Sequence, residues 1–114
     1  SLRMNGPGRP WSAACLDALS ELLGETPEVT QKVMFGVPAF FVTSRVFCCV
    51  WGEGVGLRLP TVQAQSLIGV DALAPFRPFG RAPMSGWIQR DLTLPIVGAE
   101  RALIEAACAH VRAL

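Results

Sequence analysis

Apolar residues recur at helical spacing near the start of the chain. This stripe alternates with polar residues on the opposite face, which predicts a helix over Trp11–Leu23. Ser12 is suited to cap the first turn, and Gly24 followed by Pro27 ends the helix. The members of the stripe are Cys15, Leu16, Leu19, Leu22 and Leu23.

A second stripe of the same spacing predicts a helix over Ala99–Ala113, with Arg101 and Glu105 paired on its outer face. A shorter apolar stripe after Pro60 predicts a helix over Thr61–Ile68. The inner face of the last helix is expected to consist of Leu103, Ile104, Ala107, Cys108, Val111 and Leu114.

Between these helices the chain changes to short apolar runs separated by turn residues, a pattern typical of strands. The densest run is Lys32–Leu59, and its two central strands are apolar on both faces. We expect helices against one of these faces, and a second subunit is a candidate for the other. The expected strands are Glu28–Phe35, Ala39–Val42, Val46–Trp51, Val55–Leu59, Phe76–Phe79 and Ser85–Asp91, with turns at Thr43–Arg45, Gly52–Gly54 and Gly80–Pro83.

The order of these elements is helix, three to four strands, helix, one or two strands, helix. It predicts a two-layer α+β domain, in which helices pack on one face of a single antiparallel sheet. A chain of 114 residues is suited to one domain, which we assign to residues 11–114. Residues 1–10 are rich in glycine and proline and are expected to form a flexible tail.

Composition narrows the classes of protein that the chain can belong to. Hydrophobic residues make up 51% and charged residues 17%, which excludes a disordered chain and predicts an apolar patch or a homo-oligomer interface. The net charge of +1 gives no general attraction to nucleic acid. A signal peptide and a long apolar run are both lacking, so we expect a cytoplasmic protein without membrane contact.

The residue types that carry chemistry are sparse and scattered. The four cysteines lack the paired spacing of a zinc site and are expected to be buried, reduced thiols. The only histidine, His110, falls near the end of the last helix, where a catalytic pair is not indicated. The glycines of Gly52–Gly56 join two strands and open no phosphate-binding helix. We therefore expect no enzyme activity, no catalytic residues, no cofactor and no metal.

Two sets of residues are candidates for binding. Basic residues and tryptophans from the strand-rich region suit an anionic ligand or nucleic acid; the candidate surface is Lys32, Arg58, Arg77, Arg81 and Trp87, with Arg90 and Trp51 from the same region. The competing interpretation pairs the arginines with glutamates and buries the tryptophans in the core. Apolar side chains suit a small-ligand pocket or, alternatively, the core: Met34, Phe35, Phe40, Phe41, Phe47 and Trp51.

Three segments resemble the N-terminal domain of the TfoX/Sxy family: Lys32–Gly36 (KVMFG), Val46–Leu59 (VFCCVWGEGVGLRL) and Gly80–Trp87 (GRAPMSGW). A more distant similarity connects them with YjbR/MmcQ-like and YdhG-like small domains. The resemblance spans about Pro27–Leu114 and implies a two-layer α+β fold with an antiparallel sheet. It supplies no catalytic residues. Whole TfoX proteins are positive regulators of natural competence, so the resemblance implies a role in regulation of that kind.

The leading functional expectation is a non-enzymatic, cytoplasmic protein-interaction or regulatory module that acts as a homodimer and has a regulatory protein partner. The first alternative is a nucleic-acid-binding accessory module in transcriptional regulation, with DNA as its partner. The second alternative is a small-ligand-binding domain.

Overall fold

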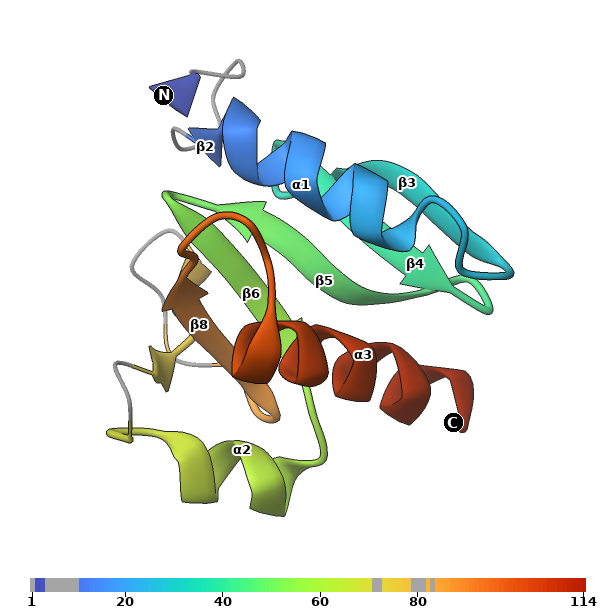
Figure 1. The fold of residues 1–114 in the computed structure, drawn as a ribbon. Coiled ribbons are helices and arrows are strands. Elements are labelled where there is room, and N and C mark those ends of the chain that lie inside the picture. The colour runs from blue at the N-terminus through green and yellow to red at the C-terminus, as the bar shows by residue number, and fades with distance from the viewer. Residues whose placement is uncertain (1, 4–10, 71–72, 79–81, 83) are drawn as a thin grey trace.

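The computed structural model describes residues 2–3, 11–70, 73–78, 82 and 84–114. Its helices are α1 (Ala13–Leu23), α2 (Thr61–Leu67) and α3 (Gly98–Arg112) (Figure 1). Its strands are β1 (Leu2–Arg3), β2 (Trp11–Ser12), β3 (Val29–Met34), β4 (Val37–Val42), β5 (Arg45–Trp51), β6 (Gly54–Arg58), β7 (Ala74–Pro75) and β8 (Trp87–Asp91). The main sheet has six antiparallel strands in the order β3-β4-β5-β6-β8-β7. The predicted α+β class is confirmed.

Most predicted elements are found within two residues of their expected bounds. The exceptions lie where the periodic pattern of apolar residues is weakest, in the connection before β8 and in the N-terminal residues. The short strand expected at Phe76–Phe79 is instead Ala74–Pro75, and Phe79 and most of the turn Gly80–Pro83 lie outside the described residues. In the expected tail, Leu2–Arg3 pairs with Trp11–Ser12, and the remaining residues up to position 10 lie outside the described part of the chain.

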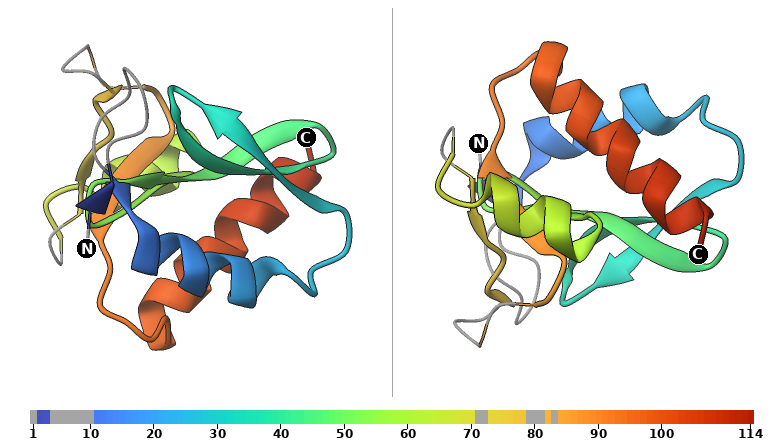
Figure 2. Two further views of the ribbon diagram at one scale, coloured as in Figure 1. Left: turned by 90° about the horizontal axis from the view of Figure 1, so that it is seen from above. Right: turned by 90° about the horizontal axis from the view of Figure 1, so that it is seen from below.

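α1 is anchored at its start to the turn between β5 and β6. The Ser12 hydroxyl accepts a hydrogen bond from the backbone N–H of Cys15 at 3.1 Å, which confirms Ser12 as the N-cap. The backbone N–H of Ser12 donates to the carbonyl of Gly52 at 2.9 Å. From this anchor α1 crosses the sheet on the same face as α3 (Figure 2).

The helix-covered face of the sheet can be followed from Arg90, which contacts Glu100 of α3. Strand register places Val55 opposite Arg90 and Leu57 opposite Ile88, so these residues share the face of Arg90. Continuing across the sheet, Val50 pairs with Val55 and Cys48 with Leu57. These apolar side chains are at most 2% exposed, and they form the core beneath α1 and α3.

The second face of the sheet is covered by Phe76, which follows β7 and is fully buried. Its ring contacts Trp51 edge-on, with centroids 5.0 Å apart, and Trp87 at 5.4 Å. A methyl group on Gly56 would lie only 3.1 Å from the sulfur of Cys49 and 3.2 Å from the ring of Phe76. The missing side chain at Gly56 therefore leaves the space that Phe76 fills. Phe76 of the same chain therefore covers part of the sheet face for which a second subunit was a candidate.

Replacing the Phe76 ring should destabilise the fold strongly. Phe76→Ala leaves a cavity between Trp51 and Trp87 and is expected to lower the free energy of unfolding by about 3–5 kcal/mol. Urea denaturation monitored by tryptophan fluorescence measures the change. Val62→Ala, at a side chain that is 80% exposed, is the control and should stay within about 0.5 kcal/mol of wild type. A Phe76→Ala protein as stable as this control would contradict the assignment.

Candidate functional site

The basic residues of the predicted binding surface do not gather in one place. Lys32 is exposed on β3 and Arg77 is exposed just after β7, and these strands form opposite edges of the sheet. Arg58, at the end of β6, is half-buried. Trp87 is only 5% exposed and packs against Phe76, so it is a core residue and offers no ring for stacking. Arg81 lies outside the described residues.

Arg90 follows the competing interpretation, in which arginines pair with glutamates. Its Nε lies 3.3 Å from a carboxylate oxygen of Glu100, and the two side chains are 16% and 12% exposed. The same carboxylate oxygen accepts a hydrogen bond from the backbone N–H of Thr93 at 3.3 Å. Glu100 therefore ties β8 and the loop after it to the first turn of α3.

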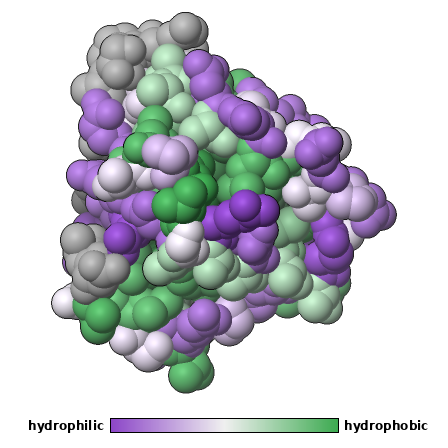
Figure 3. Space-filling view, in the orientation of Figure 1, coloured by the Kyte–Doolittle hydropathy of each residue, from purple (hydrophilic) through white to green (hydrophobic). Residues whose placement is uncertain are grey.

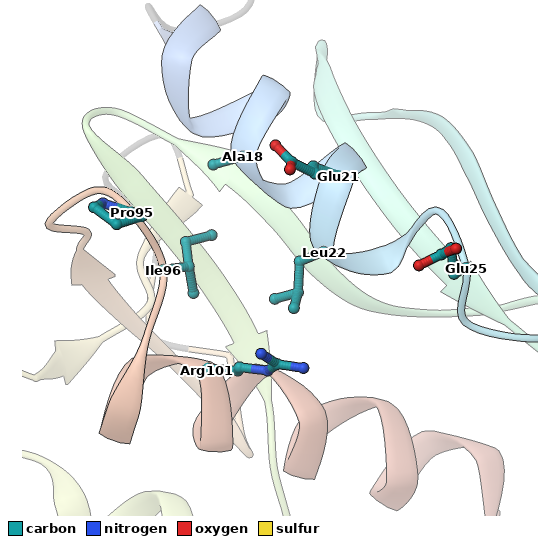
Figure 4. A pocket seen from close by; sticks show the side chains of 7 residues that line it. All are labelled: Ala18, Glu21, Leu22, Glu25, Pro95, Ile96 and Arg101. Carbon is teal, nitrogen blue, oxygen red and sulfur yellow. The ribbon is translucent and has the colours of Figure 1, made fainter.

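A cleft of about 360 Å³ separates α1 from α3 (Figure 4). Leu22 and Ile96 line its apolar part, while Glu21 and Glu25 bring carboxylates from the α1 side. Arg101 stands on the α3 side and pairs with Glu105, as predicted, at 3.2 Å. Both partners of that pair are more than half exposed, so water screens their charges. The cleft therefore orients a polar ligand only weakly.

A second groove, of about 430 Å³, runs between α2 and α3. We call it the α2–α3 groove; it is lined by Gln63, Leu67, Val70, Leu73, Arg90, Ala99, Ala102, Leu103 and Ala106. Its surface is mostly apolar, and hydrophobic side chains gather over α2 and the adjoining part of α3 (Figure 3). Val70 at its edge is 54% exposed. Its lining is more apolar than that of the cleft between α1 and α3.

A partial signal for this groove is present in the amino-acid sequence. Ala99, Ala102 and Ala106 recur at helical spacing on α3, beside the stripe that forms the core. Leu103 was predicted to face inward with that stripe, but it is only half-buried and lines the groove. Leu114 was assigned to the same inner face and is 53% exposed instead. The apolar face of α3 is thus wider than the part of it that the core covers.

The four cysteines are buried and free, as predicted. Burial raises the pKa of Cys49 to about 12 and raises the pKa of Cys48 well above its usual range. Burial also raises the pKa values of Cys15 and Cys108. The thiolate is the nucleophilic form of cysteine, so all four are poor nucleophiles at neutral pH. Within the described part of the chain, no three potential metal-binding side chains cluster.

The apolar side chains proposed for a ligand pocket belong largely to the core. Phe47 is fully buried, and Phe40 and Trp51 are 3% and 4% exposed. Beside Phe40 there is a hollow of about 110 Å³ between α1 and β3. Ligand sites usually measure roughly 300–1,000 Å³, so this hollow is too small for a typical ligand. His110, in the last turn of α3, is half-buried.

Comparison with known proteins gives no family for this chain. No protein-family model matches it, and neither the curated proteins nor the solved structures contain a match. None of the helices in the described residues is long and apolar enough to pass through a membrane.

The scattered basic residues predict that the protein does not bind duplex DNA. Lys32 and Arg77 lie on opposite sheet edges, so they do not form one compact basic patch of the kind that binds the phosphates of a duplex. Fluorescence anisotropy of a labelled duplex should show no binding at micromolar protein, at low or at physiological salt. Micromolar binding that falls steeply with salt, and that weakens in Arg58→Ala but not in Arg45→Ala, would contradict this prediction.

Buried thiols also predict a loss of stability in alkaline solution. The pKa of Cys49 is raised from 9.0 to about 12, so above pH 9 the unfolded chain releases a proton that the folded protein keeps. Stability is complete below pH 9 and falls as the pH rises towards 12, by up to about 1.4 kcal/mol per pH unit for each such thiol. Urea denaturation under reducing conditions at pH 8, 9 and 10 measures the decline.

The control for this measurement is Cys49→Ala, which removes one of the titrating groups. Its stability should decline less steeply with pH than that of the wild type. The sequence contains no tyrosine and a single lysine, Lys32, so few other groups titrate in this range. Equal slopes for the two proteins would show that Cys49 titrates alike in the folded and unfolded states.

Proposed function

We propose that this chain is a non-enzymatic regulatory domain that acts by protein–protein contact, with its partner docked in the α2–α3 groove. The observation that carries the proposal is the apolar lining of this groove. Leu67, Leu73 and Leu103 line it together with the alanines of α3. Binding grooves commonly measure roughly 300–1,000 Å³ and are lined mostly by apolar side chains, and this groove has both properties.

The partner segment that suits the groove is the apolar face of an amphipathic helix. Ala99, Ala102 and Ala106 carry small side chains, which let a second helix approach α3 closely. Arg90 is the one charged residue in the lining, and Glu100 already neutralises it. An occupant with apolar anchors at helical spacing therefore meets no unpaired charge there.

The regulatory part of the proposal is supported by the resemblance of Lys32–Gly36, Val46–Leu59 and Gly80–Trp87 to the N-terminal domain of the TfoX/Sxy family. The α+β architecture with an antiparallel sheet agrees with what that resemblance implies. Because no family model matches the chain, no binding residue is carried over from the family. The cytoplasmic location expected from the sequence belongs to the same proposal.

Site-specific photo-crosslinking in the cells that produce the protein tests this proposal. A photoreactive amino acid in place of Gln63, at the rim of the groove, should give a discrete adduct with a partner protein. Ala102→Glu places a charge in the groove without entering the core, because Ala102 is exposed, and should abolish the adduct. Ala14→Glu, at an exposed position of α1, is the matched control and should leave it unchanged.

The crosslinked segment should then bind the purified domain as a synthetic peptide. We expect Ala102→Glu to weaken this binding by about tenfold or more, the loss expected when a charge is buried without a partner. An adduct that persists in Ala102→Glu, or a crosslinked segment without an amphipathic helical pattern, would overturn the proposal.

A further inference from the structure

The two edges of the main sheet differ in how they are protected. One edge is β7, which has two residues, one of them Pro75. Proline has no N–H to donate, so this edge cannot template another strand. The other edge is β3, which has six residues and contains no proline. Among the described residues, β3 pairs with β4 alone.

The outer side of β3 has the properties of an edge strand that can accept a further strand. Its four central residues, Thr30–Val33, are all exposed. Val33 is 67% exposed, which is unusual for a β-branched apolar residue within a strand. Lys32, the one charge on the strand, leans over the ring of Phe41 at 5.6 Å from its centroid. Unpaired backbone groups along a strand of this length bind another strand readily.

We infer that a second copy of this chain pairs with β3, antiparallel, about a two-fold axis at Gln31. Such an axis runs perpendicular to the sheet and joins two six-stranded sheets into one continuous sheet. Side chains opposite each other then lie on the same face. Val29 meets Val33 of the other copy, Thr30 meets Lys32, and Gln31 meets itself.

The sequence of β3 favours this register over its neighbours. An axis at Lys32 sets two lysines directly opposite each other, which is destabilising. An axis at Thr30 pairs only residues 29–31, because Glu28 has a φ of +67° and lies outside the strand. The axis at Gln31 pairs residues 29–33 of both copies and places no like charges opposite each other. It also covers the exposed side chain of Val33 with Val29.

This interface leaves the proposed docking groove free. The α2–α3 groove includes Arg90 of β8, which is separated from β3 by three strands of the sheet. A dimer formed through β3 therefore presents two copies of the groove. Pairing through β3 and binding in the groove do not depend on each other, and different variants test them.

Charges introduced at the two-fold axis test the register. In Gln31→Glu and in Gln31→Lys, two like charges meet at the centre of the interface, and each variant alone should dimerise about fivefold more weakly than wild type. An equimolar mixture places glutamate opposite lysine and should recover the dimer. Sedimentation velocity over a range of micromolar concentrations measures the dissociation constants, and circular dichroism verifies that each variant is folded.

The matched controls are Gln65→Glu and Gln65→Lys, on the exposed surface of α2, which should dimerise as wild type does. A wild-type protein that stays monomeric at the highest concentration overturns the inference. So does an equal dimer affinity for wild type and both Gln31 variants, or a mixture no tighter than its components. Loss of the groove adduct in Ala102→Glu with an unchanged dimer supports both proposals separately.

Discussion

The packing of Phe76 over Gly56 is the contact on which the sheet depends. A sheet that is apolar on both faces needs two covers, and the helices supply only one of them. Phe76 supplies the other over the centre of the sheet, because its ring lies between Trp51 and Trp87 and fills the space above a glycine. The two tryptophans are thereby withdrawn from the surface. One aromatic residue outside any long element thus completes the core and removes the ring candidates for nucleic-acid stacking.

Once both faces are covered, the surfaces left for recognition lie at the margins of the sheet. The helix layer is fixed at β8 by the pair of Arg90 and Glu100. Beside this pair, α2 and α3 leave an apolar groove between them. At the opposite margin, β3 has no neighbour among the described residues on its outer side. Both proposals arise from these two margins, where the apolar lining of the groove and the outer side of β3 face water.

The elements were predictable from the sequence because their periodic patterns are long. The leucine stripe of α1 and the alternation of Val55 and Leu57 give helix and strand directly. Phe76 was not predictable, since a single aromatic in a proline-rich connection has no period that shows which surface it meets. The placement of the basic residues was not predictable for a related reason: Lys32 and Arg77 lie close together only if the strand order brings their strands together, and their strands are at opposite edges. The order of strands depends on long-range pairing, which local patterns do not encode.

The short, proline-containing strand β7 has a consequence for the size of any assembly. When two identical edges pair about a two-fold axis, both are used up, and growth can continue only from the remaining edges. In this fold the remaining edge is two residues long and includes Pro75. Addition of further strands is therefore blocked at both ends of such a pair, so that pairing through β3 would stop at two copies.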